Sequence, residues 1–299
     1  MAVVQDPSVQ RRRLRAELRR ARDAAGLKQA EVARAMDWSP SKLIRIETGQ
    51  VNISTNDLRA LLSYYEVRDK TRVSSLLDLA RSSRAGSFYD QFVHYLKPGF
   101  REYLAYEASA SVIRQYDPVL ISGLLQTEEY ARSVLEHTYG VGSDDTDRLW
   151  AIRQHRQELH DRDDPPDMLF VVDEATIARQ VGRSGKTMLR QLERLRMYAD
   201  EPHVTLQVLP FAAGAHPGMA GPFALLEFAD ATLDDLVHLE SVDQVTIKDD
   251  SEQLARYLDR YQKLEELALS PEESGRFLDD YISRQRAAAG PAPAAEVAG

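Results

Sequence analysis

The fold of the N-terminal part is most clearly indicated by the segment Leu27-Lys28-Gln29-Ala30-Glu31-Val32-Ala33 and, after a short break, Trp38-Ser39-Pro40-Ser41-Lys42-Leu43-Ile44-Arg45-Ile46-Glu47-Thr48-Gly49. Apolar residues recur in both segments at helical spacing. Ser39 followed by Pro40 is typical of the first turn of a helix. The pattern therefore predicts two short helices, 28–36 and 39–48, joined by a tight turn at which the small Ala33 allows close approach.

The second of these helices has an inner and an outer face. Leu43 and Ile46 are expected to point into the core, which leaves an outer face of Pro40, Ser41, Lys42, Ile44 and Arg45. A helix of this width fits the major groove of B-DNA, where its first residues reach the base edges. We expect base contacts from Pro40, Ser41, Lys42 and Arg45, with Arg45 suited to a bidentate contact with guanine.

Contacts to the DNA backbone are expected on either side of this helix. Gln29 begins the preceding helix, where its amide and backbone N–H groups are suited to a phosphate. Ser39 and Thr48 flank the outer face at its two ends. Arg12 and Arg13, in an arginine-rich first helix, are expected to add contacts that release counterions.

The rest of the chain divides by pattern into two domains and a tail. Further helices at 9–25, 54–65 and 70–81 complete an all-α domain of five helices over 8–84. After 82–86, which has the composition of a linker, helical patterns alternate with short apolar runs at 168–172, 203–209, 222–228 and 236–240. This predicts an α+β domain over 88–286 with a small sheet of about four strands. The Ala-, Pro- and Gly-rich segment 287–299 is expected to be a disordered tail.

The charge is distributed unevenly along the chain. The formal net charge is −9, yet residues 1–84 contain 17 Lys and Arg against 10 Asp and Glu, and the remainder contains 21 against 37. A basic domain joined to an acidic one indicates that only the first meets a polyanion. The absence of cysteine excludes disulfides and thiolate metal sites. With no signal-peptide pattern and no apolar run of bilayer length, we expect a cytoplasmic protein that does not enter membranes.

Signals for an enzyme are weak. A phosphate-binding loop ending in Gly185-Lys186-Thr187 would need glycine at position 180, which is Gln180. His155 and His160 are five residues apart and do not share a helical face. We therefore expect no enzymatic activity, no cofactor and no metal.

The N-terminal segment resembles the helix-turn-helix of the Xre/lambda-repressor-like family. The residues that carry the resemblance are Gly26, Leu27, Gln29, Val32, Ala33, Ser39, Leu43, Ile46, Glu47 and Gly49, within a match over 14–77. In that family an arginine late in the first helix pairs with a glutamate near the end of the recognition helix. The resemblance implies that Arg22 and Glu47 form this pair and serve fold stability.

The C-terminal part resembles the domain of unknown function that follows such helix-turn-helices in many actinobacterial regulators. The matching stretches are 122–131, 173–182, 204–216 and 222–228. The resemblance implies a transcription regulator, often encoded beside a small partner protein in a toxin–antitoxin-like arrangement. It implies no known ligand.

Two functions remain open. In the first, the protein is a sequence-specific DNA-binding regulator, a homodimer on two half-sites of double-stranded DNA, modulated through its C-terminal domain. In the second, it is an antitoxin-like module that mainly binds a small neighbouring-gene protein and contacts DNA for autoregulation. The loop 210–222, with Gly214, His216 and Gly218, is the candidate surface for a partner or ligand.

Overall fold

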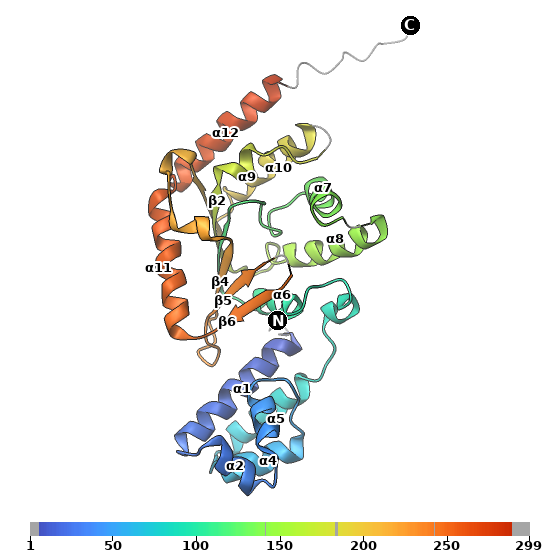
Figure 1. The fold of residues 1–299 in the computed structure, drawn as a ribbon, viewed down its shortest axis with the longest axis vertical. Coiled ribbons are helices and arrows are strands. Elements are labelled where there is room, and N and C mark those ends of the chain that lie inside the picture. The colour runs from blue at the N-terminus through green and yellow to red at the C-terminus, as the bar shows by residue number, and fades with distance from the viewer. Residues whose placement is uncertain (1–5, 141, 183–184, 242, 289–299) are drawn as a thin grey trace. The chain divides into compact units, whose positions relative to one another are not determined.

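The computed structural model describes residues 6–140, 142–182, 185–241 and 243–288, shown as a ribbon in Figure 1. By their internal contacts these residues form two compact units. The first comprises residues up to Ala110 together with Phe228–Asp235, and the second comprises Ser111–Glu227 together with the chain from Leu236 onward.

The first unit is helical. Its helices are α1 (Pro7–Ala24), α2 (Gln29–Ala35), α3 (Pro40–Glu47), α4 (Thr55–Tyr64), α5 (Lys70–Ser82), the 3-10 helix η1 (Phe88–Phe92) and α6 (Phe100–Glu107). Side-chain caps fix several starts, since Asp6, Ser54 and Asp69 each accept a hydrogen bond from a first-turn N–H. A single apolar core joins α1 to α5, and it includes Leu18, Leu43, Leu58, Leu61 and Leu76.

This unit contains the five helices predicted over 8–84, but it is larger than that domain. The predicted boundary at 84–88 is not where the contacts divide the chain. Helix α6 packs against α1, so the segment up to Ala110 belongs to the first unit. Phe228–Asp235 joins it from far along the sequence. A linker-like composition marked the end of the helix-turn-helix core and not the end of the compact unit.

The second unit is built on one mixed sheet. Its strands are β1 (Val112–Asp117), β2 (Asp167–Asp173), β3 (Val204–Leu209), β4 (Phe223–Glu227), β5 (Leu236–Glu240) and β6 (Val245–Lys248). They lie in the order β3-β2-β1-β4-β5-β6. The pairs β1–β2 and β2–β3 are parallel, whereas β1–β4, β4–β5 and β5–β6 are antiparallel.

Helices lie on both sides of this sheet. They are α7 (Glu128–Tyr139), α8 (Ser143–Gln157), α9 (Glu174–Ala178), α10 (Gly185–Tyr198), α11 (Ser251–Leu267) and α12 (Pro271–Ala288), with short 3-10 turns η2 (Phe211–Ala213) and η3 (Pro217–Ala220). In Figure 1, α11 lies on one side of the sheet and α7, α8 and α10 lie on the other. Tyr261 and Leu264 of α11 pack against sheet residues Tyr116, Val171 and Phe223. Helix α12 packs against β3 and α10.

The expected sheet of about four strands was too small, because β1 and β6 were missed. Strand β1 buries only Ile113 and Tyr116, so its sequence lacks the alternation that marks a half-buried strand. Strand β6 has four residues of intermediate exposure at the sheet edge, which leaves no apolar pattern to detect. The expected tail 287–299 lies outside the described residues except for Ala287 and Ala288, which end α12.

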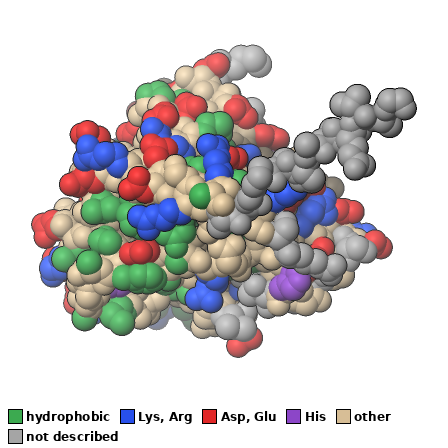
Figure 2. All heavy atoms as spheres, turned by 90° about the horizontal axis from the view of Figure 1, so that it is seen from above, with side chains coloured by type: hydrophobic (Ala, Val, Ile, Leu, Met, Phe, Trp, Pro, Cys, Tyr) green, Lys and Arg blue, Asp and Glu red, His purple; other side chains and the backbone are tan. Residues whose placement is uncertain are grey.

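The surface drawn in Figure 2 carries charges of both signs. Basic and acidic side chains are intermixed on that face, and hydrophobic side chains gather toward one side of it. Mixed charge of this kind is typical of a solvated surface.

Candidate nucleic-acid interface

Helices α2 and α3 form a tight helix-turn-helix. The turn is closed by a 2.8 Å hydrogen bond from the Trp38 N–H to the Ala33 carbonyl, across Asp37 in a left-handed conformation. Ala33 is 1% exposed, as expected where two helices approach closely. Trp38 packs partly into the common core, which ties the turn to α4 and α5.

Helix α3 presents the two faces predicted from its spacing. Leu43 and Ile46 are buried in the core, and Glu47 beside them is also buried. Pro40, Ser41, Ile44 and Arg45 are exposed. The outer face is therefore free of the packing that holds the inner one.

A buried ion pair locks α3 to the helices behind it. The Arg22 Nε donates to Glu47 Oε1 at 2.8 Å, and a second guanidinium nitrogen lies 3.3 Å from Oε2. Glu47 is 3% exposed, and the hydrogen bond to it raises the pKa of Arg22 against the opposing effect of burial. These are the two residues to which the family resemblance assigned a structural role. A bidentate pair in this setting fixes the orientation of α3 relative to α1.

Gln29 belongs to the same network. Its side-chain nitrogen donates to Glu47 Oε2 at 2.7 Å, so this amide donor serves the fold. At the start of α2 the Glu31 carboxylate accepts from the Lys28 backbone N–H at 2.8 Å. A phosphate contact at this helix start thus depends on backbone N–H groups more than on the Gln29 amide nitrogen.

The two basic side chains of α3 are held differently. The Lys42 ammonium lies 3.1 Å from Asp57 Oδ2 of α4 and 4.0 Å from the centre of the Trp38 ring. The Arg45 Nε makes a 3.3 Å bond to the Ser41 carbonyl of its own helix, and the side chain is exposed. Lys42 is drawn toward α4, whereas Arg45 extends from the outer face. The role of Asp57 and Trp38 in holding Lys42 left no signal in the sequence.

The residues at the two ends of α3 are polar and exposed. The Ser39 and Ser41 hydroxyls are 3.1 Å apart at its start. At its end the Thr48 hydroxyl donates to the Ile44 carbonyl at 2.8 Å, and the Thr48 carbonyl accepts from Arg15 at 2.6 Å. Gly49 has φ +78°, a left-handed conformation that favours glycine, and a Cβ there would displace the flexible end of the Arg15 side chain.

Arg12 does not lie where a phosphate contact requires it. It is 5% exposed, with its guanidinium 5.2 Å from the centre of the Tyr106 ring and 5.4 Å from that of Phe228. Arg13 is partly exposed, and its guanidinium lies 3.2 Å from Asp230. The expectation that Arg12 reaches DNA is corrected by its burial, and Arg13 already has a carboxylate partner. The residues that contact these two arginines come from α6 and 228–235, and no local sequence pattern linked those segments to α1.

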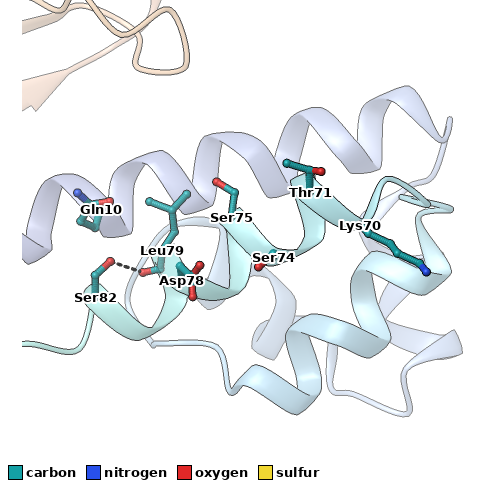
Figure 3. A pocket seen from close by; sticks show the side chains of 8 residues that line it. All are labelled: Gln10, Lys70, Thr71, Ser74, Ser75, Asp78, Leu79 and Ser82. Carbon is teal, nitrogen blue, oxygen red and sulfur yellow. Dashed lines mark hydrogen bonds between the residues drawn. The ribbon is translucent and has the colours of Figure 1, made fainter.

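An open groove of about 730 Å³ lies between α1 and α5 (Figure 3). The residues that line it are Gln10, Lys70, Thr71, Ser74, Ser75, Asp78, Leu79 and Ser82. Half of its lining residues carry hydroxyls, and the others are Gln10, Asp78, Leu79 and the single cation Lys70. None of the predicted DNA-contacting residues lines this groove.

In the second unit, the candidate loop 210–222 packs onto the ends of β1 and β2. His216 lies edge-on to Tyr116, with Nε2 3.7 Å from Asp173 Oδ2, and the Tyr116 hydroxyl donates to the same carboxylate at 3.2 Å. A Cβ at Gly218 would lie 2.4 Å from the Tyr116 ring, so only glycine fits there. Gly214, with φ +69°, allows the turn between η2 and His216. These contacts give His216 and Gly218 a packing role.

The carboxylates near this loop are engaged in local structure. Asp173 caps α9 by accepting from the Ala175 N–H at 2.8 Å, as expected for a strand-to-helix boundary. Glu174 accepts from the Phe211 N–H at 2.7 Å. Among the described residues, no group of three His, Asp or Glu is placed to hold a metal ion.

Two family models match the chain. One, described as a helix-turn-helix domain, matches residues 13–76 and so covers α2 and α3. The other, described as Domain of unknown function (DUF5753), matches residues 100–280, more than half of the chain. The chain belongs to the DUF5753 family. The DUF5753 match includes all six strands of the sheet.

The comparisons go no further than these two families. No curated protein and no solved structure matches the chain. The protein is thus a DUF5753 member with an N-terminal helix-turn-helix domain, and its Xre subtype and toxin–antitoxin-like arrangement stay predictions. Within the described part of this DUF5753 protein, no helix has both the length and the apolar character needed to span a membrane.

Proposed function

We propose that this protein is a sequence-specific DNA-binding transcription regulator whose α3 helix enters the major groove. The observation that carries the proposal is the division of α3 into a locked inner face and an exposed outer face. Glu47 on the inner face is held by Arg22 and Gln29, while Ser41 and Arg45 on the outer face are exposed. A rigidly oriented helix with an exposed polar face is what base contacts in the groove require.

The proposed contacts differ in kind. Arg45 makes the bidentate contact to guanine, and Ser41 and Pro40 lie against neighbouring bases. Lys42 contributes mainly to a phosphate, because Asp57 and Trp38 draw its ammonium sideways. Ser39, Thr48 and the backbone at Gln29 contact phosphates on either side.

A homodimer is the expected DNA-binding form. One α3 helix contacts only a few base pairs, and two helices on half-sites about one helical turn apart give a longer site. The C-terminal domain is proposed to supply the dimer contacts and to modulate binding. Light scattering at micromolar protein that shows only monomer contradicts the dimer without touching the contacts of α3.

The direct test is selection of duplexes from a random-sequence pool by the full chain, followed by binding titrations of the enriched duplex. We expect a motif with related half-sites, and weaker binding to a scrambled duplex. Arg45→Ala should lose preference at one position of the half-site. Arg68→Ala is the matched control, because its pair with Glu66 is exposed and lies outside α2 and α3. Selection that enriches no motif contradicts the proposal.

The partner-binding alternative has one observation in its favour. Phe211 and Met219, on the candidate loop 210–222, are 61% and 70% exposed. These two large apolar side chains are therefore available on this loop to contact a protein partner. In this case the purified neighbouring-gene protein should bind the full chain, and Phe211→Ser with Met219→Ser should abolish that binding while sparing the DNA motif.

A further inference from the structure

Helix α3 carries an exposed aliphatic side chain that the fold does not use. Ile44 is 43% exposed on the outer face, next to Arg45, whereas Leu43 and Ile46 are fully or almost fully buried. Its neighbours one turn away on the same face, Ser41 and Thr48, have short side chains. Ile44 therefore protrudes from a polar surface.

The major groove offers one apolar group to such a side chain. Every other base edge presents hydrogen-bond donors or acceptors there, and only thymine presents a methyl group. An isoleucine has no polar atom with which to contact a donor or an acceptor, so its preferred partner in the groove is that methyl. The adjacent Arg45 has the opposite chemistry and suits guanine.

We infer that Ile44 is a specificity-determining residue that packs against the 5-methyl group of a thymine in each half-site, beside the guanine contacted by Arg45. The inference rests on the proposed function, because it assumes that the outer face of α3 lies in the groove. It adds a hydrophobic contact to the polar contacts of Arg45 and Ser41. The half-site then contains a thymine that no hydrogen bond from α3 explains.

Uracil gives an exact chemical test, because it differs from thymine only by this methyl. The full chain is titrated against the selected duplex and against duplexes in which one thymine at a time is replaced by uracil. Burial of one methyl corresponds to about fourfold in affinity, so one replacement should weaken binding by about that factor. The other replacements should have little effect.

Combining an Ile44 substitution with the uracil replacement tests whether Ile44 is the residue that contacts the methyl. Ile44→Ala should weaken binding to the thymine duplex by about four- to tenfold and should remove the further loss caused by uracil at that position. Ile44→Val should give an intermediate loss. Val51→Ala is the matched control, since Val51 is another exposed aliphatic, 37% exposed, just beyond α3; this variant should retain the full uracil penalty. Because Ile44 is exposed, thermal unfolding of the Ile44 variants should match the wild type.

The outcomes separate the inference from the proposed function. If no duplex is enriched, the proposed function fails, and the inference fails with it. If a motif is enriched and Arg45→Ala impairs it, but uracil has no effect at any thymine, only the inference is overturned. A uracil penalty that persists unchanged in Ile44→Ala also overturns it, because another residue then contacts the methyl.

Discussion

Helices α1 and α3 both carry clustered basic side chains on the same small core, but several arginines of α1 contact other protein groups whereas Arg45 of α3 is exposed. Among the seven arginines of α1, Arg12 lies between two aromatic rings, Arg13 faces Asp230, and Arg15 donates to the Thr48 carbonyl. On α3, Lys42 is held by Asp57 and Trp38, whereas the Arg45 side chain is exposed and bonds to the Ser41 carbonyl of its own helix. The longer run of arginines is thus the one held by protein.

The net charge of a segment therefore indicates which domain meets a polyanion, but it does not identify the residues that contact it. A guanidinium that pairs with a carboxylate or stacks on a ring is held in place and so cannot reach a phosphate freely. A carboxylate partner also compensates its charge, which weakens its attraction for a phosphate. Such pairing depends on residues far along the chain, here Tyr106, Phe228 and Asp230. If α1 stabilises the unit and α3 binds DNA, substitutions in the two helices should change stability and DNA binding separately.

The largest effect is expected from Arg22→Ala, which leaves the buried Glu47 carboxylate with Gln29 as its remaining side-chain partner among those described. Breaking a buried pair by removing one partner costs about 3–5 kcal/mol. The free energy of unfolding from urea titrations should fall by this order, and amide exchange in α3 should accelerate. Arg68→Ala, at an exposed pair, serves as the control. An equal loss in both variants contradicts a special role for the Arg22–Glu47 pair.

Arg45→Ala should cost about 1–3 kcal/mol of binding to the selected duplex and relax preference at one base position. Lys42→Ala should instead weaken all duplexes alike and lower the salt dependence by about one counterion. Neither variant should lower the melting temperature strongly, since both side chains lie on or near the surface. Equal loss of sequence preference in the two variants shows that Asp57 and Trp38 do not withdraw Lys42 from the bases.

Arg12→Ala should affect stability and leave DNA binding largely alone. Loss of a desolvated guanidinium between two rings costs about 1–2 kcal/mol. The salt dependence of DNA binding should be unchanged, in contrast to the sequence-based expectation that Arg12 contacts a phosphate. Arg19→Ala, at an exposed arginine of the same helix, should leave the free energy of unfolding nearly unchanged. A reduced salt slope in Arg12→Ala reinstates the phosphate contact.

The smallest effect is expected at Asp230. Burial raises the pKa of its carboxyl, but hydrogen bonds from Thr232 and the charges of Arg13 and Arg20 outweigh this, so the pKa lies below its ordinary value of 3.8. The ionised carboxylate therefore stabilises the unit above pH 3.8, and this contribution disappears as the pH falls through the lower pKa of the folded state.

Asp230→Asn should accordingly lower the free energy of unfolding slightly at pH 7, by less than about 1 kcal/mol for a partly exposed pair. The difference from the wild type should shrink as the pH falls below 3.8 and through the lower pKa of the folded state. Asp78→Asn, which removes an exposed partner of Arg81 within one helix, is the control. A difference that stays constant over the whole acid titration below pH 3.8 shows that Asp230 acts through packing and not through its charge.

The helix-turn-helix could be predicted closely because its signals are local. Leu43 and Ile46 alternate with Ser41 and Arg45 at the period of an α-helix, and Ser39-Pro40 starts the helix, so neighbouring residues suffice to place its two faces. The sheet was harder to predict from the sequence. Strand β1 is defined by its partners β2 and β4 and buries too few side chains for an alternation to appear in its own sequence.

Helix periodicity and capping act within a few residues, so the two helices, their inner and outer faces and the candidate Arg45 follow from local sequence. Which basic residues are exposed depends on packing between distant parts of the chain. Tyr106 contacts Arg15 from 91 residues along the chain. Ala231, next to Asp230, contacts Arg20 from 211 residues along the chain. Burial and ion pairing at such separations arise from chain folding, and no pattern among neighbouring residues encodes them.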